Sequence, residues 1–173
     1  GLTHVNFEDA ASKSRYILPL TRENTRTIDR TGGTFLHSSR TNPSKMKSIP
    51  EFLKGLEFPS DQKTKDGVTS TVFDMSKQVL KNLETLQLDY LIAIGGDDTL
   101  SYAAKLDQLG FKVVCIPKTM DNDVRNTEYC IGFSTAVSRA NDAIQRQRTT
   151  VGSHERIGIF RIFGRDAGYT ALY

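Results

Sequence analysis

The chain has 173 residues, which is enough for one domain with a hydrophobic core. Its composition, 38% hydrophobic and 25% charged, is ordinary for a globular protein, and a net charge of +3 gives no sign of a nucleic-acid or membrane partner. No apolar run approaches the ~18 residues of a transmembrane helix, and the first residues lack the apolar core of a signal peptide. Cys115 and Cys130 show no metal-ligand spacing, so we expect reduced thiols in a cytoplasmic protein.

The first part of the chain carries few signals of regular structure. Residues 1–20 show no clear pattern, and residues 21–24 are expected to open a polar helical turn. Residues 34–36 are a candidate for a short strand, which runs into a turn around Arg40. Residues 44–67 are polar and contain Pro and Gly, so they are expected to be loop.

Hydrophobic periodicity organises the chain from residue 72 onward. An apolar stripe at helical spacing predicts a packed helix, and its members are Val72, Met75, Val79, Leu83 and Leu86. Two nearly continuous apolar segments follow, residues 89–94 and 111–116, with a predicted helix over 99–109 between them. Such runs are typical of parallel strands that are covered on both faces.

The remaining pattern predicts a helix over residues 133–144, a strand over 157–163 and another helix from Asp166. Strands that alternate with helices in this way predict an α/β fold, a doubly wound and mostly parallel sheet with helices on both faces. In such sheets ligands bind at the carboxyl ends of the strands. The residues of interest fall at these ends.

The first of these strand ends is Gly95-Gly96-Asp97-Asp98-Thr99. Two glycines let the backbone turn sharply beside a ligand, and the free N–H groups that begin the next helix can bind a phosphate. Asp97 could hold Mg²⁺, because this cation prefers carboxylate oxygen. Asp98 would repel phosphate, which makes sense if it excludes one group while Mg²⁺ and a lysine hold another. Alternatively, Asp98 or Thr99 only caps the helix.

The next strand end is Pro117-Lys118-Thr119-Met120-Asp121-Asn122-Asp123. Asp121 has the chemistry of a general base, and Asp123 could orient a hydroxyl substrate or support a metal. Lys118 supplies positive charge where phosphoryl charge develops. The alternative is an acidic turn that Asn122 shapes.

Two arginines flank the predicted strand over residues 157–163. Arg156 precedes it and Arg165 follows it, so the two lie at opposite ends and cannot easily share a ligand within one subunit. We expect Arg156 to point toward the site of a neighbouring subunit. The alternative is a solvated charge at the end of a strand.

In their order and spacing, these segments resemble the phosphofructokinase family, and within it the pyrophosphate-dependent branch. The matching segments, spread over roughly residues 20–173, are Gly32-Gly33-Thr34 with Ser38-Ser39-Arg40, Gly95–Thr99, Pro117–Asp123, Ser153-His154-Glu155-Arg156 and Phe163-Gly164-Arg165. The resemblance implies a phosphofructokinase-like fold and phosphoryl transfer to the 1-hydroxyl of fructose 6-phosphate in glycolysis. It also implies that Asp121 is the base and that Asp97 is associated with magnesium.

The resemblance also implies the remaining site residues. The expected sugar-binding residues are Thr119, Met120, Asp123, Arg156, Phe163, Gly164 and Arg165, with Phe163 where the family usually has Met. The expected donor-binding residues are Arg40, Gly95, Gly96 and Thr99. Lys118 and Asp98 are expected to act with Asp121 in catalysis.

Asp98 and Lys118 together indicate that pyrophosphate is the phosphoryl donor. Family members that use ATP usually have Gly in place of Asp98 and often Gly in place of Lys118. The aspartate would oppose the α-phosphate of a nucleotide, and Lys118 would stabilise transfer from pyrophosphate. An ATP-dependent enzyme of the same fold and a non-catalytic sugar-phosphate-binding subunit are the alternatives.

The family pattern also includes parts that residues 1–173 lack. These parts are an initial glycine-rich phosphate loop and a second half with further substrate-binding residues. We therefore expect the chain to be the larger part of a first domain, inactive by itself, from a homo-oligomeric protein in which Arg156 reaches a neighbouring subunit.

Overall fold

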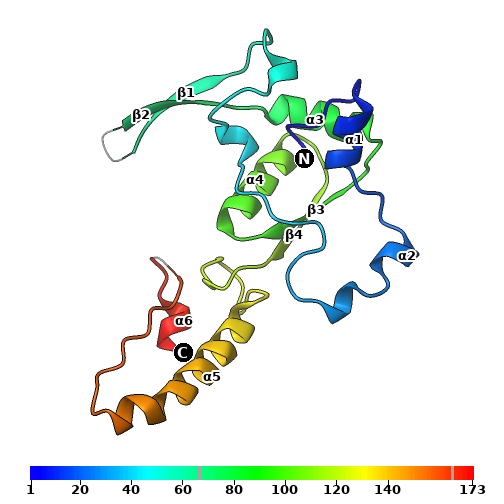
Figure 1. Cartoon of the computed structure of the whole chain (residues 1–173). Helices are drawn as coiled ribbons and strands as arrows, with labels where there is room; N and C mark the ends of the chain where they lie inside the picture. Colours follow the sequence, from blue (N-terminus) through cyan, green and yellow to red (C-terminus); the bar gives the residue numbers. More distant parts are fainter. Residues whose placement is uncertain (66–67, 165) are drawn as a thin grey trace. The chain divides into compact units, whose positions relative to one another are not determined.

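The computed structural model describes residues 1–65, 68–164 and 166–173 (Figure 1). These residues form two compact units, Gly1–Asp89 and Tyr90–Tyr173. None of the described helices has the length and apolar character that crossing a membrane requires.

The first unit consists of short helices and one β-hairpin. Its elements are α1 (Ala10–Tyr16), α2 (Arg22–Thr25), the 3-10 turns η1 (Ile28–Arg30), η2 (Pro43–Lys45) and η3 (Glu51–Leu53), the strands β1 (Ser60–Lys65) and β2 (Val68–Phe73), and α3 (Ser76–Thr85). The expected helical turn is α2, which Thr21 begins through a capping box with Asn24. Helix α1 was not expected, although Asp9 begins it as an N-cap that accepts from two backbone N–H groups.

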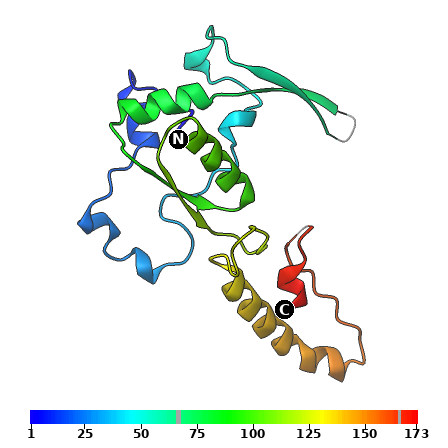
Figure 2. The same cartoon turned by 180° about the vertical axis from the view of Figure 1, so that it is seen from behind.

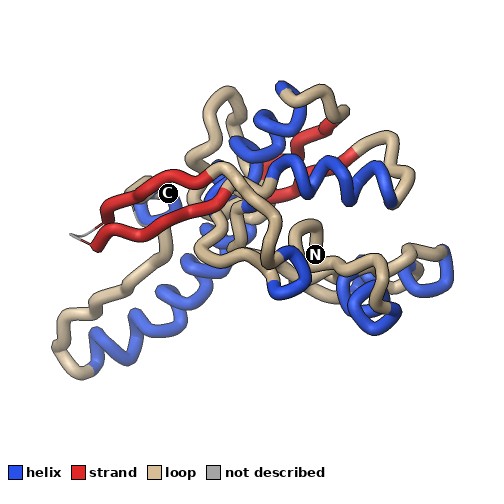
Figure 3. Tube along the Cα trace, turned by 90° about the horizontal axis from the view of Figure 1, so that it is seen from above, coloured by secondary structure: helices blue, strands red, loops and turns tan. Residues whose placement is uncertain are grey.

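Two expectations for this unit are wrong. Residues 34–36 lie in a turn and not in a strand. Residues 44–67 were expected to be loop, yet they contain η2, η3 and β1, which pairs antiparallel with β2 (Figure 3). The strand signal was absent because β1 is polar at every position, with no alternation that would indicate a buried face.

The core of the first unit lies beneath α3 and at the base of the hairpin. Met75, Val79 and Leu83 of the predicted stripe are fully buried, which confirms the helix. Val72 belongs to β2 instead, because the helix begins at Ser76. Met46 joins the base of the hairpin to this core, since it exchanges two backbone hydrogen bonds with Phe73.

The second unit is built on two parallel strands. Its elements are β3 (Leu91–Gly95), α4 (Asp97–Gln108), β4 (Val113–Pro117), α5 (Phe133–Ser153) and α6 (Tyr169–Leu172). Strands β3 and β4 pair in register from Leu91 opposite Val113 to Gly95 opposite Pro117, and α4 packs against both strands. Each of these elements agrees in type with the sequence expectation, within three residues at the ends, except that α5 continues nine residues past the expected end at residue 144.

Helix α6 lies beside α5 (Figures 1 and 2). Aromatic side chains join the two at the start of α5. Phe133 is buried and meets the ring of Tyr173 edge-on at 5.6 Å between centroids. Tyr129 stacks on the same Phe133 ring at 5.9 Å. This cluster fixes the end of the described chain next to the loop that follows β4.

The strand expected over residues 157–163 is wrong. These residues form no ladder with any part of the described chain, and Ile157 and Ile159 are 92% and 91% exposed. The apolar sequence favours a strand, yet a strand also needs a neighbouring edge to pair with. Complete coverage of β3 is also not observed, because Ile92 and Ile94 remain more than half exposed.

The fold class agrees with the prediction at its coarser level. The chain mixes helices with a parallel strand pair, as an α/β protein does. The described strands form two separate two-stranded sheets. The doubly wound sheet therefore stays a prediction.

Candidate functional site

The carboxyl ends of β3 and β4 lie next to each other. The amide of Lys118 donates a 2.8 Å hydrogen bond to the carbonyl of Gly95, which extends the parallel pairing past the strand ends. A Cβ placed on Gly96 would lie 3.5 Å from the Cβ of Thr119. The structure thus brings the two polar segments of the sequence to one edge of the sheet, as parallel pairing requires.

The turn from β3 into α4 depends on Gly95. This residue is buried, and a Cβ added to it would lie 2.6 Å from Oγ1 and 2.7 Å from Cβ of Thr99. Gly96 is the N-cap of α4, and no side chain caps the helix. The alternative in which Asp98 or Thr99 caps the helix is therefore wrong, because the side chain of Thr99 lies against Gly95.

Asp97 and Asp98 occupy the first turn of α4, and both are exposed. Carboxylates at this position are favourable to the helix, since they face the positive end of its dipole. The same exposure leaves their oxygens accessible to a ligand or a cation at the strand ends. A helix-stabilising role and a binding role are therefore compatible for these two residues.

Side-chain hydrogen bonds within the segment after β4 hold its backbone in a turn. The hydroxyl of Thr119 accepts a 3.1 Å hydrogen bond from the amide of Asp121. Asn122 has a positive φ of 51°. Its side chain accepts from the amide of Cys130 at 2.8 Å and donates to the carbonyl of Glu128 at 3.0 Å. Asn122 thus shapes the turn that presents Asp121 and the exposed Asp123.

Two later segments of the chain form hydrogen bonds with this turn. The amide of Ile131 donates to the carbonyl of Pro117 at 3.0 Å, beside an isolated parallel bridge between Lys118 and Ile131. The hydroxyl of Thr170 on α6 donates to the carbonyl of Met120 at 2.5 Å, and Thr170 is buried. Sequence reasoning did not single out Thr170, because a lone threonine in a short helix gives no signal of such a contact.

Arg156 lies away from the strand ends. It follows α5, whose 21 residues begin next to the turn after β4. A helix of this length extends about 32 Å, so its far end cannot share a ligand with Lys118 in the same chain. Arg156 is exposed, and its backbone amide donates to the carbonyl of Val151.

The Phe163-Gly164-Arg165 element is only partly described. Gly164 is buried with a φ of 131°, and its carbonyl accepts from the amides of Ala167 at 2.7 Å and Gly168 at 3.2 Å, a turn that leads into α6. Phe163 is 79% exposed. Arg165 lies outside the described residues. Among the described residues, the segment that follows this element contacts the site through the bond from Thr170 of α6 to Met120.

Arg40 belongs to the first unit. It is exposed in the segment between η1 and η2. Its expected contact with the phosphoryl donor stays a prediction.

Comparison with known proteins decides the family. The phosphofructokinase family model matches residues 4–173, which includes every segment of the strand-end site. The chain belongs to the phosphofructokinase family.

Some relatives of the chain are named as pyrophosphate-dependent enzymes and others as ATP-dependent enzymes. The chain is 41% identical over 156 residues to a pyrophosphate–fructose 6-phosphate 1-phosphotransferase of Dictyoglomus thermophilum, which covers 90% of this chain and 38% of that protein. It is 39% identical over 143 residues to the protein of the same name from Thermoproteus tenax (82% of this chain, 35% of that protein). It is also 38% identical over 142 residues to the ATP-dependent 6-phosphofructokinase 3 of Bacteroides thetaiotaomicron (82% and 36%). The chain thus spans little more than a third of the length of these relatives.

If magnesium binds at the strand ends, the acidic residues of this chain would hold it together with a substrate and not as a closed protein cage. Among the described residues, no three His, Cys, Asp or Glu side chains converge as a metal-binding group. Mg²⁺ is commonly held by one or two carboxylates together with substrate phosphates and water. The exposed carboxylate of Asp97 at the strand ends suits that arrangement.

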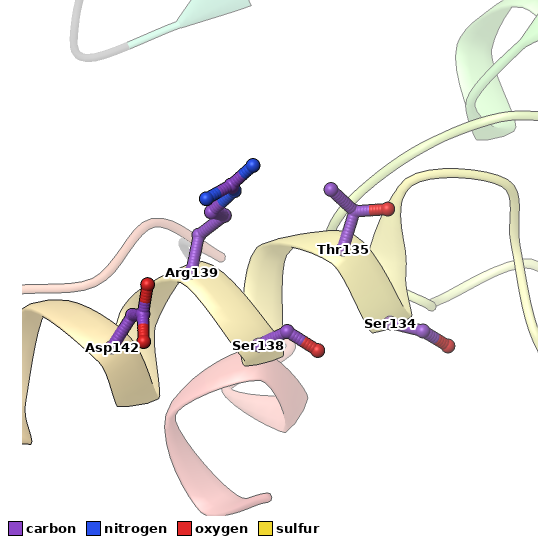
Figure 4. A pocket seen from close by; sticks show the side chains of 5 residues that line it. All are labelled: Ser134, Thr135, Ser138, Arg139 and Asp142. Carbon is purple, nitrogen blue, oxygen red and sulfur yellow. The ribbon is translucent and has the colours of Figure 1, made fainter.

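A separate open hollow runs along one side of α5 (Figure 4). The residues that line it are Ser134, Thr135, Ser138, Arg139 and Asp142. Asp142 is paired with Arg146 at 3.5 Å. The hollow contains none of the predicted site residues, and the family resemblance does not assign it a role.

Proposed function

We propose that the protein containing this chain transfers a phosphoryl group from pyrophosphate to the 1-hydroxyl of fructose 6-phosphate. The products are fructose 1,6-bisphosphate and phosphate. The observation that carries the proposal is the hydrogen bond from Lys118 to Gly95, which places a lysine, a base candidate and an acidic helix start at one sheet edge. Membership of the phosphofructokinase family and the names of the relatives from Dictyoglomus and Thermoproteus support it.

Asp121 is the proposed general base. It would take the proton of the 1-hydroxyl as that oxygen attacks the phosphorus atom that is transferred. Its backbone is held by Thr119, and its neighbour Asn122 is anchored at two points. A base held in this way loses little freedom when the substrate binds, which favours the reactive geometry.

Lys118 and Asp98 are proposed to select the donor. Lys118 would neutralise charge on the transferred group, and Asp98 would repel the additional phosphate of a nucleotide. Both side chains are exposed at the same sheet edge and accessible to a ligand there. The turn at Gly95 and Gly96, with Thr99 packed behind it, would let the donor approach the backbone.

Asp97 would hold the magnesium ion that the family resemblance implies. Bound there, magnesium would neutralise the oxygens of pyrophosphate while leaving the attacking hydroxyl to Asp121. The remaining family residues would complete the substrate site in the whole, oligomeric and cytoplasmic protein. They are Met120, Asp123, Phe163, Gly164 and Arg165 for the sugar, Arg156 from a neighbouring subunit for the 6-phosphate, and Arg40 for the donor.

An ATP-dependent reaction at the same site is the second candidate. The observation that favours it is the 38% identity to the ATP-dependent enzyme of Bacteroides thetaiotaomicron. The two donors are distinguished by assaying the full-length protein with fructose 6-phosphate, Mg²⁺ and either pyrophosphate or ATP. Turnover with pyrophosphate that exceeds turnover with ATP is expected; robust turnover with ATP alone would overturn the donor assignment.

The same assay tests the non-catalytic alternative. A sugar-phosphate-binding subunit would bind fructose 6-phosphate without turnover with either donor. The site argues against this alternative, because Lys118, Asp121 and Asp123 are kept together on a turn built around Thr119 and Asn122.

A further inference from the structure

The outer edge of β1 carries unpaired backbone groups in a defined pattern. Phe73 exchanges both of its backbone hydrogen bonds with Met46, at 2.9 and 2.8 Å, on the side of β2 away from β1. Ser60 lies opposite Phe73 in the hairpin, so these two residues form a non-hydrogen-bonded pair. The amide of Asp74 donates to the carbonyl of Pro59 at 2.8 Å, as the alternation requires for the next pair.

The same alternation fixes the direction of every backbone group in β1. Ser60, Gln62 and Thr64 direct their N–H and C=O groups away from β2, whereas Asp61 and Lys63 direct theirs toward it. Among the described residues, no backbone partner bonds the outward groups of Ser60, Gln62 and Thr64. The outer edge of β1 is therefore a row of donors and acceptors available to another strand.

The described side chains of β1 give the hairpin little stability of its own. Both strands are mostly polar in sequence. The side chains of Asp61, Lys63 and Thr64 are exposed. A two-stranded hairpin is marginal in water, whereas three or more strands can be stable. In the described part of the hairpin, the contact that holds it to the rest of the unit lies at its base, between Met46 and Phe73.

We propose that β1 pairs antiparallel with β1 of a second copy of this chain, about a two-fold axis at Gln62. The two Gln62 residues would then form a hydrogen-bonded pair, and Ser60 would pair with Thr64 of the second copy. Ser60, Gln62 and Thr64 of each copy would therefore all form backbone hydrogen bonds across the interface. Two hairpins would become one four-stranded sheet with an isologous interface.

Charge complementarity identifies the second copy as the occupant. In this register Asp61 lies directly opposite Lys63 of the second copy, twice by symmetry, in the closely spaced type of pair. Neither residue has an ion-pair partner in the described chain. A shift of the axis to residue 61 would oppose two aspartates. A shift to residue 63 would oppose two lysines at position 63, although it would also bring residue 61 opposite residue 65 twice. Charge therefore favours the register centred on Gln62, in which no like charges lie opposite each other.

Charged residues on an edge strand often prevent pairing, and lysine is the usual choice. An edge that only repels would carry one sign of charge. Here Asp61 and Lys63 stand two residues apart on one face of β1, so each neighbouring register opposes one like-charged pair and the register centred on Gln62 opposes none. This pattern favours a specific partner over general protection.

Charge exchange in the full-length protein tests the interface, with sedimentation velocity as the measurement. Asp61→Lys and Lys63→Asp should each raise the dissociation constant of the hairpin-dependent dimerisation about tenfold or more. An equimolar mixture of the two variants should restore association, because each mixed pair again opposes Lys to Asp. Lys77→Asp, at an exposed position in the first turn of α3, is the matched control and should leave association unchanged.

Two further variants keep the test decisive. Gln62→Pro removes an outward N–H without removing a bond of the hairpin and should abolish the association step while thermal unfolding stays cooperative. Gln62→Cys should form an intermolecular disulfide on mild oxidation, above the background that the exposed Cys115 sets in the unchanged protein. The proposal is overturned if the charge variants and Gln62→Pro sediment like the unchanged protein, or if the mixture associates no better than either variant alone.

Discussion

The amide of Lys118 donates to the carbonyl of Gly95, and this bond joins the two segments that carry the chemistry of the site. Lys118 directly follows Pro117, which pairs with Gly95 at the end of the sheet. A change that disturbs the turn at Gly95 therefore also moves the turn that contains Asp121.

Gly95→Ala should destabilise the protein and lower its activity. The added Cβ would lie 2.6 to 2.9 Å from three side-chain atoms of Thr99, and a β-branched residue in a helix cannot easily turn away. We expect a loss of about 1–3 kcal/mol, measured as the free energy of unfolding. Gly96→Ala is the control, since its Cβ would make ordinary contact with Thr119 at 3.5 Å. Equal melting temperatures for the two variants would contradict this packing.

Asp121→Asn should lower turnover of fructose 6-phosphate by about 10²–10⁴-fold and leave the binding of fructose 6-phosphate largely intact, because an amide cannot take the proton of the attacking hydroxyl. Initial rates in the full-length protein and a separate binding measurement provide the two readouts. Asp107→Asn, on the exposed side of α4, is the matched control and should keep normal rates. Near-normal turnover of the Asp121 variant would remove this residue as the base.

Asp98→Gly should shift donor preference toward ATP. Like charges a few ångströms apart repel by about 1–4 kcal/mol in a partly solvated site, so removal of the carboxylate should change the ratio of ATP to pyrophosphate turnover by about tenfold or more. The ratio of kcat/KM values for the two donors is the measurement. An unchanged ratio would count against Asp98 as the residue that excludes nucleotide.

Asn122→Gly should weaken the turn after β4. Glycine accepts the positive φ of 51°, so the variant isolates the loss of the two side-chain hydrogen bonds to Glu128 and Cys130. The expected cost is about 1–3 kcal/mol in the free energy of unfolding, with a raised KM for fructose 6-phosphate. Asn126→Gly is the control at a similar φ of 62° on an exposed residue. If the two variants unfold alike, Asn122 does not anchor the turn.

Local pattern was sufficient to predict much of the second unit. The parallel strands at residues 91–95 and 113–117, the helix between them and the first part of α5 all follow from periodicity and glycine positions, whereas the extension of α5 to Ser153 does not. Because the strands are parallel and consecutive, the meeting of Asp97 and Asp98 with Lys118 at one edge was also foreseeable. The family resemblance was likewise carried by short segments in order.

Other features depended on contacts that no local pattern contains. The hairpin of β1 and β2 has no apolar face to indicate it, and it forms because Met46 pairs with Phe73 at its base. The apolar residues 157–163 have the composition of a strand, yet they remain unpaired within the described chain because a strand requires an edge to bond with.

The sequence by itself determined the chemical groups, their order along the chain and the strand ends on which they lie. The tertiary structure decided how they are held: Thr99 fills the space beside Gly95, Asn122 anchors the turn of Asp121, and Thr170 bonds the carbonyl of Met120 from 50 residues away. It also decided that α5 carries Arg156 away from the strand ends. The physical reason is that side-chain type and spacing are properties of neighbouring residues, whereas hydrogen bonds and packing between distant segments exist only after the chain has folded.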